Sequence, residues 1–514
     1  MLRMTPSPRY AGAKGRPFPS PRVAAIRCTH LFLEFFDELR FAAGADSGAD
    51  DGFERGRCGA IWGWGIWGRA ARKKGALCHA SLVARPGSCV REIAGGRRCA
   101  EVGFGRFLRN EAVTVAGLSA AAAERTGYRA AGRDVLAIQD TSEIVLGGAK
   151  VRAKGFGPVG KGGNLGGVLL HPVLTVDARS GEVLGLADIS VRNRDKGKVG
   201  PRADRSKSDK ESRRWLDGAR RAGEVLARAR RITVVSDRES DIYEDFARKP
   251  DNVDLLVRAN HNRRLEEGDL LFDYANSLPE GERFVVAIPA SPGRAPRKAT
   301  LALRFGAVTI CRPGSGMPAA DAKTLPKTIR LHLVDIVEVA PPDGVASIHW
   351  RLLTTHAVEN IGQARLMLDF YRKRWIIEEF FRTLKSAGFQ VEAAEIGDPD
   401  ALMKFLALAA IAAVTVTQLV RARDNPHGQS LIDAFDQGDQ TLIEAICADY
   451  EGPNPTKRQT NPHPKGTMAF ATWVIARLGA WTGYYGKPGP RVLNRGLQEF
   501  HAIKYGAKLA RGNV

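Results

Sequence analysis

Cysteine, methionine and aromatic residues are scarce in this 514-residue chain, which has seven cysteines, six methionines and 7% aromatic residues. No two cysteines stand at the spacing of zinc ligands, and their odd number argues against a disulfide framework. Most of them lie in the first hundred residues, at Cys28, Cys58, Cys78, Cys89 and Cys99. We therefore expect free thiols and a reducing compartment.

Long hydrophobic runs and a secretion signal are also lacking. The longest apolar run, Phe405 to Val416, is too short to span a bilayer and predicts a buried core helix. The N-terminus is rich in Arg and Pro and has no apolar stretch before a cleavage site. These features predict a cytoplasmic protein that does not contact a membrane.

Acidic residues are too few to balance the basic ones. The chain has 77 Lys and Arg against 56 Asp and Glu, which gives a formal net charge of +21. A surplus of that size favours a polyanionic partner, most often nucleic acid. The alternative is a protein from a GC-rich genome, where codon usage inflates Arg, and the abundant Ala and Gly agree with this alternative.

Periodicity divides the chain into six regions. Residues 1–85 lack helical or strand periodicity apart from a short helix at Thr29–Phe41, and we interpret them as disordered or as the product of a mis-assigned start codon. An aromatic segment that stacks on nucleic acid, at Ile61–Gly68, is the alternative. The patterns predict helices in 86–133, strands and a helix in 134–252, mostly strands in 253–355, helices in 356–420 and mixed helical segments in 421–514.

The stretch Asp369–Lys385 contains no Gly or Pro and predicts one uninterrupted helix. At about 100° per residue, four of its side chains fall within roughly a 60° arc: Tyr371, Arg374, Glu378 and Lys385. Such a stripe suits phosphate handling beside a metal ion, because the cations hold phosphates while the carboxylate ligates Mg²⁺. The alternative is a solvated, salt-bridged helix face.

Two further carboxylates follow apolar, strand-like runs. Asp140 ends the run that begins at Val135, and Asp237 ends the run that begins at Ile232. Together with Glu378, they would be three carboxylates from separate elements, the set that binds two divalent metal ions for in-line attack at phosphorus. A single Asp at a strand end is more often a turn or cap residue, so the prediction depends on the context of all three.

That context consists of three motifs: Gln139-Asp-Thr141, Ser236-Asp-Arg-Glu-Ser-Asp-Ile-Tyr243 and Tyr371-x2-Arg374-x3-Glu378-x6-Lys385. They resemble the motifs of bacterial cut-and-paste DDE transposases with the Y-R-E-K signature, the IS-four family typified by the Tn-five element. The stretch between Asp237 and Glu378 is similar to the β-strand insertion of that family. From residue 100 onwards, the resemblance implies an α/β fold whose RNase H-like core is interrupted by a mostly β insertion domain, with helical N- and C-terminal regions.

The resemblance implies a role for each matching position. The implied metal-binding and catalytic triad, which would hold two Mg²⁺ or Mn²⁺ ions, is Asp140, Asp237 and Glu378. The implied contacts to the phosphates of the element end are Tyr371, Arg374 and Lys385.

Three further positions match DNA-contacting residues of the family. Arg238 and Arg258 correspond to arginines that contact DNA, although Arg258 is equally well interpreted as a plain surface arginine. Trp350 matches a tryptophan of the insertion that the family uses against a flipped base, and stacking of that kind is worth about 1–3 kcal/mol. The alternative for Trp350 is a half-buried aromatic residue of a strand.

Two neighbouring acids compete for roles in this constellation. Glu379 lies next to Glu378 but is displaced by about 100° from the arc, so we choose Glu378 as the ligand. Asp241 lies four residues after Asp237. We interpret Asp241 as a solvated helix residue rather than as an acid that supports the metal ligands.

The resemblance implies a DNA transposase that cleaves double-stranded DNA at transposon ends and transfers the 3′-hydroxyl ends to target DNA. Joining two ends needs two subunits, so a homodimer on DNA is implied, and Gly486–Gly496 is similar to the closing segment where the family makes subunit contacts. The helical N-terminal domain of the family is matched only by Phe104–Val113. That departure leaves two alternatives: a decayed copy that binds DNA and dimerises without catalysis, or an RNase H-like nuclease.

Overall fold

A computed structural model describes residues 69–146, 154–160, 163–194, 211–288, 295–314, 323–423, 425, 428–452, 459–484 and 486–510. The short helix predicted at Thr29–Phe41 and the aromatic segment Ile61–Gly68 lie outside these residues. Contacts within the chain group residues 51–506 into one unit. Of the second unit, residues 1–50 with 507–514, only the end of the last helix is described.

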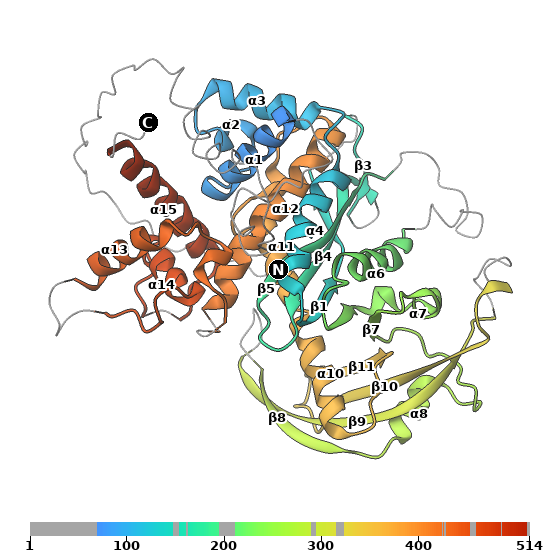
Figure 1. Cartoon of the computed structure of the whole chain (residues 1–514). Coiled ribbons are helices and arrows are strands. Elements are labelled where there is room, and N and C mark those ends of the chain that lie inside the picture. The colour runs from blue at the N-terminus through green and yellow to red at the C-terminus, as the bar shows by residue number, and fades with distance from the viewer. Residues whose placement is uncertain are drawn as a thin grey trace, which may run out of the picture. The chain divides into compact units, whose positions relative to one another are not determined.

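Three parallel strands form the centre of a mixed sheet (Figure 1). Strand β1 pairs with β6, and β6 pairs with β7. Their bounds are Asp134–Gln139, Arg231–Ser236 and Val253–Arg258. Their apolar residues are buried because both faces of the sheet are covered, which is why these strands read as continuous hydrophobic runs.

Beyond β1 the sheet continues with antiparallel strands. Strand β4 pairs with β1, and three further strands, β2, β3 and β5, pair with β4. The bounds of β2, β3, β4 and β5 are Ser142–Val145, Gly157–Val159, Leu165–Asp177 and Val183–Arg192. The predicted α/β fold is therefore observed, and its sheet combines parallel and antiparallel pairs.

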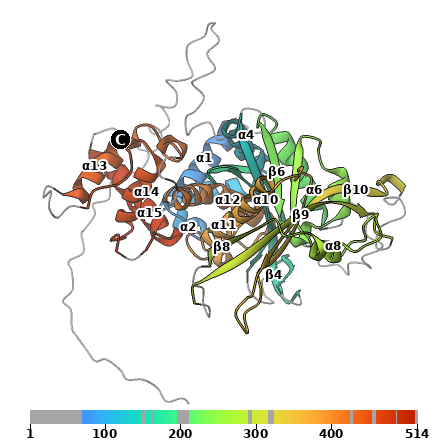
Figure 2. The same ribbon diagram turned by 90° about the horizontal axis from the view of Figure 1, so that it is seen from below.

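Four more strands extend the same sheet past β7 (Figure 2). Strand β11 pairs antiparallel with β7, and β10, β9 and β8 follow in that order. The bounds of β8, β9, β10 and β11 are Glu282–Ile288, Arg297–Cys311, Thr328–Glu338 and His349–Thr354. The region 253–355, predicted as an insertion, therefore shares one sheet with the strands before it, and its own first strand, β7, is a parallel strand of the centre.

Helices cover both faces of the central strands. In β1, Leu136 and Ile138 belong to one hydrophobic cluster with residues of α12, whereas Val135 and Ala137 belong to a second cluster with residues of α6 and α7. This alternation is the period of two of a strand that is buried on both sides. The bounds of α6, α7 and α12 are Arg213–Val225, Tyr243–Arg248 and Pro399–Ala422.

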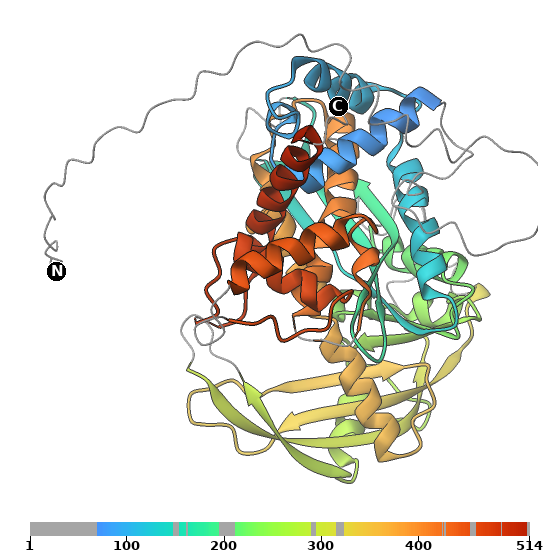
Figure 3. The same ribbon diagram turned by 60° about the vertical axis from the view of Figure 1, so that its left-hand side comes forward.

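The remaining helices lie at the two ends of the chain and beside the strands β8 to β11, which we call the added strands. Helix α10 packs against β9 and β10, and Figure 3 shows it crossing those strands. Figures 1 and 2 both show α13, α14 and α15 on the side away from α8 and β10. The bounds of α1, α2, α3, α4 and α8 are Arg69–Ala84, Val90–Ile93, Arg98–Arg109, Val115–Ala130 and Leu271–Ser277. Those of α10, α11, α13, α14 and α15 are Ile361–Lys373, Ile376–Lys385, Asp439–Glu451, Met468–Leu478 and Pro490–Ala510.

Helix α12 contains the longest apolar run of the chain. Among the described residues it is the one helix that is long and apolar enough to cross a membrane, and it exceeds the predicted run by several residues. However, 83% of its most apolar window is buried inside the fold. It contacts α1, α11, α14 and β5. The prediction of a buried core helix is therefore confirmed.

The helix predicted over Asp369–Lys385 is interrupted, so this prediction was wrong in its central part. Helix α10 ends at Lys373 and α11 begins at Ile376. Between them, the N–H of Arg374 donates to the carbonyl oxygen of Tyr371, and the N–H of Ile377 donates to that of Arg374. These bonds span three residues rather than four and tighten the backbone as in a 3₁₀-helix. No Gly or Pro marks the break.

The contact between α14 and α15 depends on a glycine. A Cβ added to Gly496 would lie 1.7 Å from the carbonyl oxygen of Ile475, whereas one added to Gly506, on the same helix, would meet nothing within 4 Å. We predict that Gly496→Ala lowers the free energy of unfolding by about 1–3 kcal/mol through overpacking. Gly506→Ala should raise it by up to about 1 kcal/mol through helix propensity. Denaturant unfolding of both variants measures this, and equal effects would contradict it.

Candidate active site

Asp140 and Asp237 come side by side because they follow neighbouring parallel strands. The register pairs Ile138 of β1 with Val235 of β6, so the two aspartates, each two residues further on, lie level with each other. The carboxyl ends of parallel strands meet at one edge of the sheet, where ligands bind in open α/β sheets. The sequence prediction that both acids sit at strand ends is therefore matched by their positions.

Each aspartate has one carboxylate oxygen engaged by nearby backbone. Asp140 Oδ1 accepts a hydrogen bond from the N–H of Thr141 at 2.7 Å. Asp237 precedes the short 3₁₀-helix η6 (Arg238–Ser240), and its Oδ1 accepts from the N–H of Glu239 at 2.8 Å. These bonds orient both carboxylates and leave the Oδ2 atoms for other partners.

The strand that carries Asp140 is interrupted at that residue without a change of register. Gln139 of β1 pairs with Val173 of β4, and Ser142 of β2 pairs with Leu170. In this register Asp140 lies opposite Pro172, which has no N–H to donate. The ladder is broken at this point, so the carboxylate projects from an interruption of the sheet rather than from a regular strand.

Arg374 brings Glu378 to the two aspartates. Its guanidinium donates from Nη1 to Asp140 Oδ2 at 3.0 Å and from Nη2 to Glu378 Oε1 at 3.3 Å. Arg374 is buried at 7% exposure although it follows the end of α10. The neighbouring Glu379 instead pairs with cations at Arg382 and Arg423. Glu378 rather than Glu379 therefore faces Asp140.

The three acids are close enough to affect one another. The pKa of Asp140 is raised from 3.8 to about 6, first because of burial and further because of the charges of Asp237 and Glu378. The N–H of Thr141 and the guanidinium of Arg374 act in the opposite direction. The charges of Asp237 and Glu378 therefore reach Asp140, which places the three acids near one another.

This donor set fits a divalent cation in charge and in chemistry. Carboxylate oxygens are the ligands that Mg²⁺ and Mn²⁺ prefer. Burial and, to a smaller extent, the neighbouring carboxylates raise the pKa of Asp140, and a cation between the acids would offset both effects. Among the residues that the structure describes, no group of three His, Cys, Asp or Glu side chains is already arranged at ligand spacing. Arg374 occupies one oxygen each of Asp140 and Glu378.

Tyr371 extends the site towards the added strands. It is buried at 3% exposure, and its ring meets that of Trp350 edge-on at 5.6 Å between centroids. Burial raises the pKa of the Tyr371 phenol, whereas the charges of Arg374 and Arg258 act in the opposite direction. The phenol is therefore neutral at physiological pH and able to donate a hydrogen bond.

Arg258 and Trp350 reach Tyr371 from neighbouring strands. Arg258 ends β7 and donates from Nη2 to the backbone oxygen of His349 in β11 at 3.1 Å. Arg258 is therefore held between β11 and Tyr371, and it is not the plain surface arginine of the alternative interpretation. Trp350 is half-buried on β11 and packs on Tyr371. This is the position that the alternative interpretation, a half-buried aromatic residue of a strand, predicted.

Lys385 and Arg238 lie at the margins of the site. Lys385 Nζ donates to the backbone oxygen of Glu143 at 2.6 Å and pairs with Glu392 at 3.1 Å, so its ammonium is engaged beside β2 rather than with Glu378. Arg238 is exposed on η6, next to Asp237. Of the nine predicted residues, the structure brings seven into mutual contact or charge interaction and leaves these two at the edge.

Asp241 is buried, so the interpretation as a solvated residue was wrong. Its Oδ1 accepts from Arg263 at 2.6 Å, and its Oδ2 accepts from the N–H groups of Asn260 and His261 at 2.7 and 2.8 Å. These bonds tie the loop after β7 to the segment after Asp237. Asp241 thus holds two site-bearing segments together, and both of its carboxylate oxygens are already engaged by these partners.

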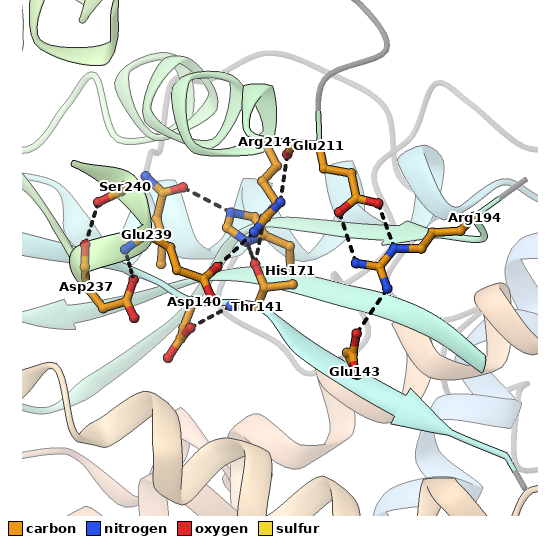
Figure 4. A network of polar contacts seen from close by, with 11 residues as sticks. Asp140, Thr141, Glu143, His171, Arg194, Glu211, Arg214, Asp237, Glu239 and Ser240 are labelled. Carbon is orange, nitrogen blue, oxygen red and sulfur yellow. Dashed lines mark hydrogen bonds and ion pairs between the residues drawn. The ribbon is translucent and has the colours of Figure 1, made fainter. Parts of the chain in front are cut away.

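A polar network behind the aspartates contains residues that sequence analysis missed (Figure 4). Arg214 of α6 donates to Thr141 and to Glu239, and His171 of β4 contacts Thr141. Thr141 and Glu239 lie inside the sequence motifs that contain Asp140 and Asp237, and this proximity was the signal that could have identified them. Nothing local in the sequence distinguishes Arg214 from its neighbouring arginines.

One comparison with known proteins bears on this geometry. The family model described as "Transposase DDE domain" matches residues 151–415 of the 514 residues. The match thus covers more than half of the chain. It contains Asp237 and Glu378 and begins after Asp140.

The raised pKa of Asp140 predicts a pH-dependent stability in the absence of divalent cations. Because the folded protein holds this proton more tightly than the unfolded chain, protonation favours folding. The contribution is complete below pH 3.8 and is lost as the pH rises through about 6. The free energy of unfolding of the wild type, relative to Asp140→Asn, should fall by about 1–3 kcal/mol over this range. Denaturant unfolding in EDTA measures it, and parallel curves would contradict it.

Proposed function

The chain belongs to the family of the transposase DDE domain, and from that premise we propose that it cuts the ends of a mobile DNA element and joins the freed 3′-hydroxyls to target DNA. The observation that carries the proposal is the convergence of Asp140, Asp237 and Glu378 around Arg374. This is the carboxylate set that two-metal phosphoryl transfer requires.

We further propose that the central strands are an RNase H-like core of the Y-R-E-K subgroup. The strand order β5–β4–β1–β6–β7, antiparallel on one side of β1 and parallel on the other, supports it. The strands β8 to β11 between β7 and α10 support the proposal of an insertion. The remaining assignments, residues 86–133 as DNA-contacting and 421–514 as dimerising, rest on the resemblance.

Three carboxylates would hold the metal ions: Asp140, Asp237 and Glu378. Two bound Mg²⁺ or Mn²⁺ ions supply an activated oxygen nucleophile and stabilise the leaving oxygen. Arg374 neutralises part of the charge of the acids in the DNA-free protein. Its planar guanidinium is suited to turn from the carboxylates to a phosphate, which it can bind through two parallel hydrogen bonds.

The side chains around the acids would position the DNA. The neutral phenol of Tyr371 can donate to a phosphate oxygen, and Arg258 is held beside it by the backbone of β11. Trp350 offers an indole to an unpaired base, although its packing on Tyr371 means that such stacking would use only its exposed part. Arg238 and Lys385 would contact phosphates further along. The net charge of +21 supports double-stranded DNA as the substrate.

We expect the triad to be essential for cleavage but not for DNA binding. Asp237→Ala and Glu378→Gln should each abolish magnesium-dependent nicking of element-end DNA while binding in a gel-shift assay survives, because phosphate contacts dominate affinity. Glu379→Gln is the matched control, since Glu379 pairs with Arg382 and Arg423 and should leave nicking within a few-fold of wild type.

The same assays distinguish the alternatives. Equal nicking by wild type and Asp237→Ala would refute the proposal. Binding without nicking by the wild type would identify a decayed copy that acts at most through DNA binding and dimerisation. Nicking without joining of ends to target DNA would favour an RNase H-like nuclease.

Arg238 gives a second, independent prediction. Because Arg238 is exposed, Arg238→Gln should leave the melting temperature unchanged yet weaken DNA binding and lower the salt slope of log K by about 1. Arg221→Gln is the control, since Arg221 pairs with Glu224 on α6. Equal salt slopes for the two variants, measured by fluorescence anisotropy between 50 and 200 mM salt, would remove Arg238 from the proposed DNA contacts.

A further inference from the structure

Arg214 links the two loops that carry Asp140 and Asp237. From α6, its Nε donates to Thr141 Oγ1 at 2.7 Å, and its Nη2 donates to Glu239 Oε2 at 3.0 Å. Thr141 follows Asp140 directly, and Glu239 lies two residues after Asp237. Figure 4 shows the guanidinium between the two loops. One rigid, planar group therefore spans the two strand ends.

The hydrogen bonds behind Arg214 form a chain with one direction. Thr141 Oγ1 accepts from Arg214 and donates to Nδ1 of His171, 2.9 Å away, because the other ring nitrogen faces an amide oxygen, which can only accept. His171 is then neutral with its proton on Nε2, which donates to Gln139 Oε1 at 3.1 Å. Gln139 Nε2 donates to the carbonyl oxygen of Trp215 at 3.3 Å. The chain starts and ends on α6, so every member is oriented by its neighbours.

The position of α6 itself is set by close packing. A Cβ on Gly218 would lie 2.3 Å from Gln139 Oε1, so the glycine lets α6 approach β1 closely enough for these bonds. Trp215 and His171 are buried and meet edge-on at 4.9 Å between ring centroids. Arg214 therefore projects from a firmly packed helix rather than from a mobile surface.

The two contacts of Arg214, here called the Thr141 arm and the Glu239 arm, differ in their exposure to solvent. Arg214 has 17% of its side chain exposed, whereas Glu239 has 62% exposed. Solvent-exposed ion pairs contribute little, while a hydrogen bond within a partly buried network resists competition from water. The Thr141 arm should therefore hold its loop more strongly than the Glu239 arm.

We propose that Arg214 is a positioning residue that sets the separation and orientation of Asp140 and Asp237 from behind, through Thr141 and Glu239, and thereby prepares them to receive divalent cations. It contacts neither metal nor DNA in this role. The part that concerns cations rests on the proposed function, whereas the linkage of the two loops does not.

Hydrogen exchange of the metal-free protein tests the linkage alone. The N–H groups of Thr141 and Glu239 are held by the carboxylates of Asp140 and Asp237. In Arg214→Met, peptides covering 140–146 and 237–242 should exchange at least about tenfold faster than in wild type, because a loop that has lost its tether opens more often. Arg213→Gln is the matched control, since the adjacent Arg213 pairs along α6 with Asp217. Unchanged exchange in both peptides would overturn the proposal.

Manganese binding tests the consequence for the site. Loss of the free Mn²⁺ signal in electron paramagnetic resonance titrations gives the dissociation constant without any reaction. Arg214→Met should weaken binding by about 10- to 100-fold, the effect typical of groups that orient metal ligands. Thr141→Val should weaken Mn²⁺ binding almost as much, whereas Glu239→Gln should weaken it by less than about fivefold. Arg214→Lys can reach only one of the two partners, so its effect on the dissociation constant should be intermediate.

Two outcomes keep the linkage and the proposed function apart. If the double variant Asp140→Asn/Asp237→Asn binds Mn²⁺ as tightly as wild type, the acids are not the metal site, and the proposed function fails while hydrogen exchange still decides the linkage. If the acids bind Mn²⁺ but Arg214→Met and Thr141→Val leave the affinity unchanged, the positioning role is refuted. Should Arg214→Met not fold, Thr141→Val and Glu239→Gln, which keep Arg214 in place, carry both measurements.

Discussion

The crowding of two carboxylates around the partly buried Asp140 is the constraint on which the rest of this site depends. Asp140, Asp237 and Glu378 approach closely enough for two of them to raise the pKa of the third, and Arg374 pairs with two of the three. Such an arrangement is unfavourable in a protein that binds no cation. The fold maintains it through backbone geometry that cannot relax easily, since two of the acids are attached to central, buried strands.

The surrounding contacts are best understood as a response to that constraint. Behind the aspartates, α6 approaches β1 through Gly218 and supplies Arg214. In front of them, Arg374 leaves the helical path and is buried against the acids. Behind the aspartates the buried side chains of Gln139 and His171 are hydrogen-bonded to each other, as expected where the local dielectric constant is low. Arg374 Nε, in contrast, is buried without a hydrogen-bond partner among the described residues. The site is therefore flanked on both sides by cations, Arg214 behind the aspartates and Arg374 in front of them.

The sequence allowed the strand-end acids and the choice of Glu378 to be predicted, because apolar runs and helical spacing are local properties. It did not allow the break at Arg374 to be predicted, because no Gly or Pro marks it and the partner of Arg374, Asp140, lies more than two hundred positions earlier. Asp241 was misjudged for the same reason, since its partner Arg263 lies in another loop. Arg214 has no local signal at all. Long-range pairing decided each of these features.

The continuity of the sheet past β7 has a consequence for how the chain can be divided. Only three residue pairs, Arg258 with Leu352, Val257 with Leu353 and Leu256 with Thr354, join β7 to β11. Deleting β8 to β11 would nevertheless leave a buried, hydrophobic strand as an open edge, the kind of surface that templates aggregation. The added strands therefore act as a lid on that edge, and a minimal catalytic fragment of this protein cannot be made by excising them alone.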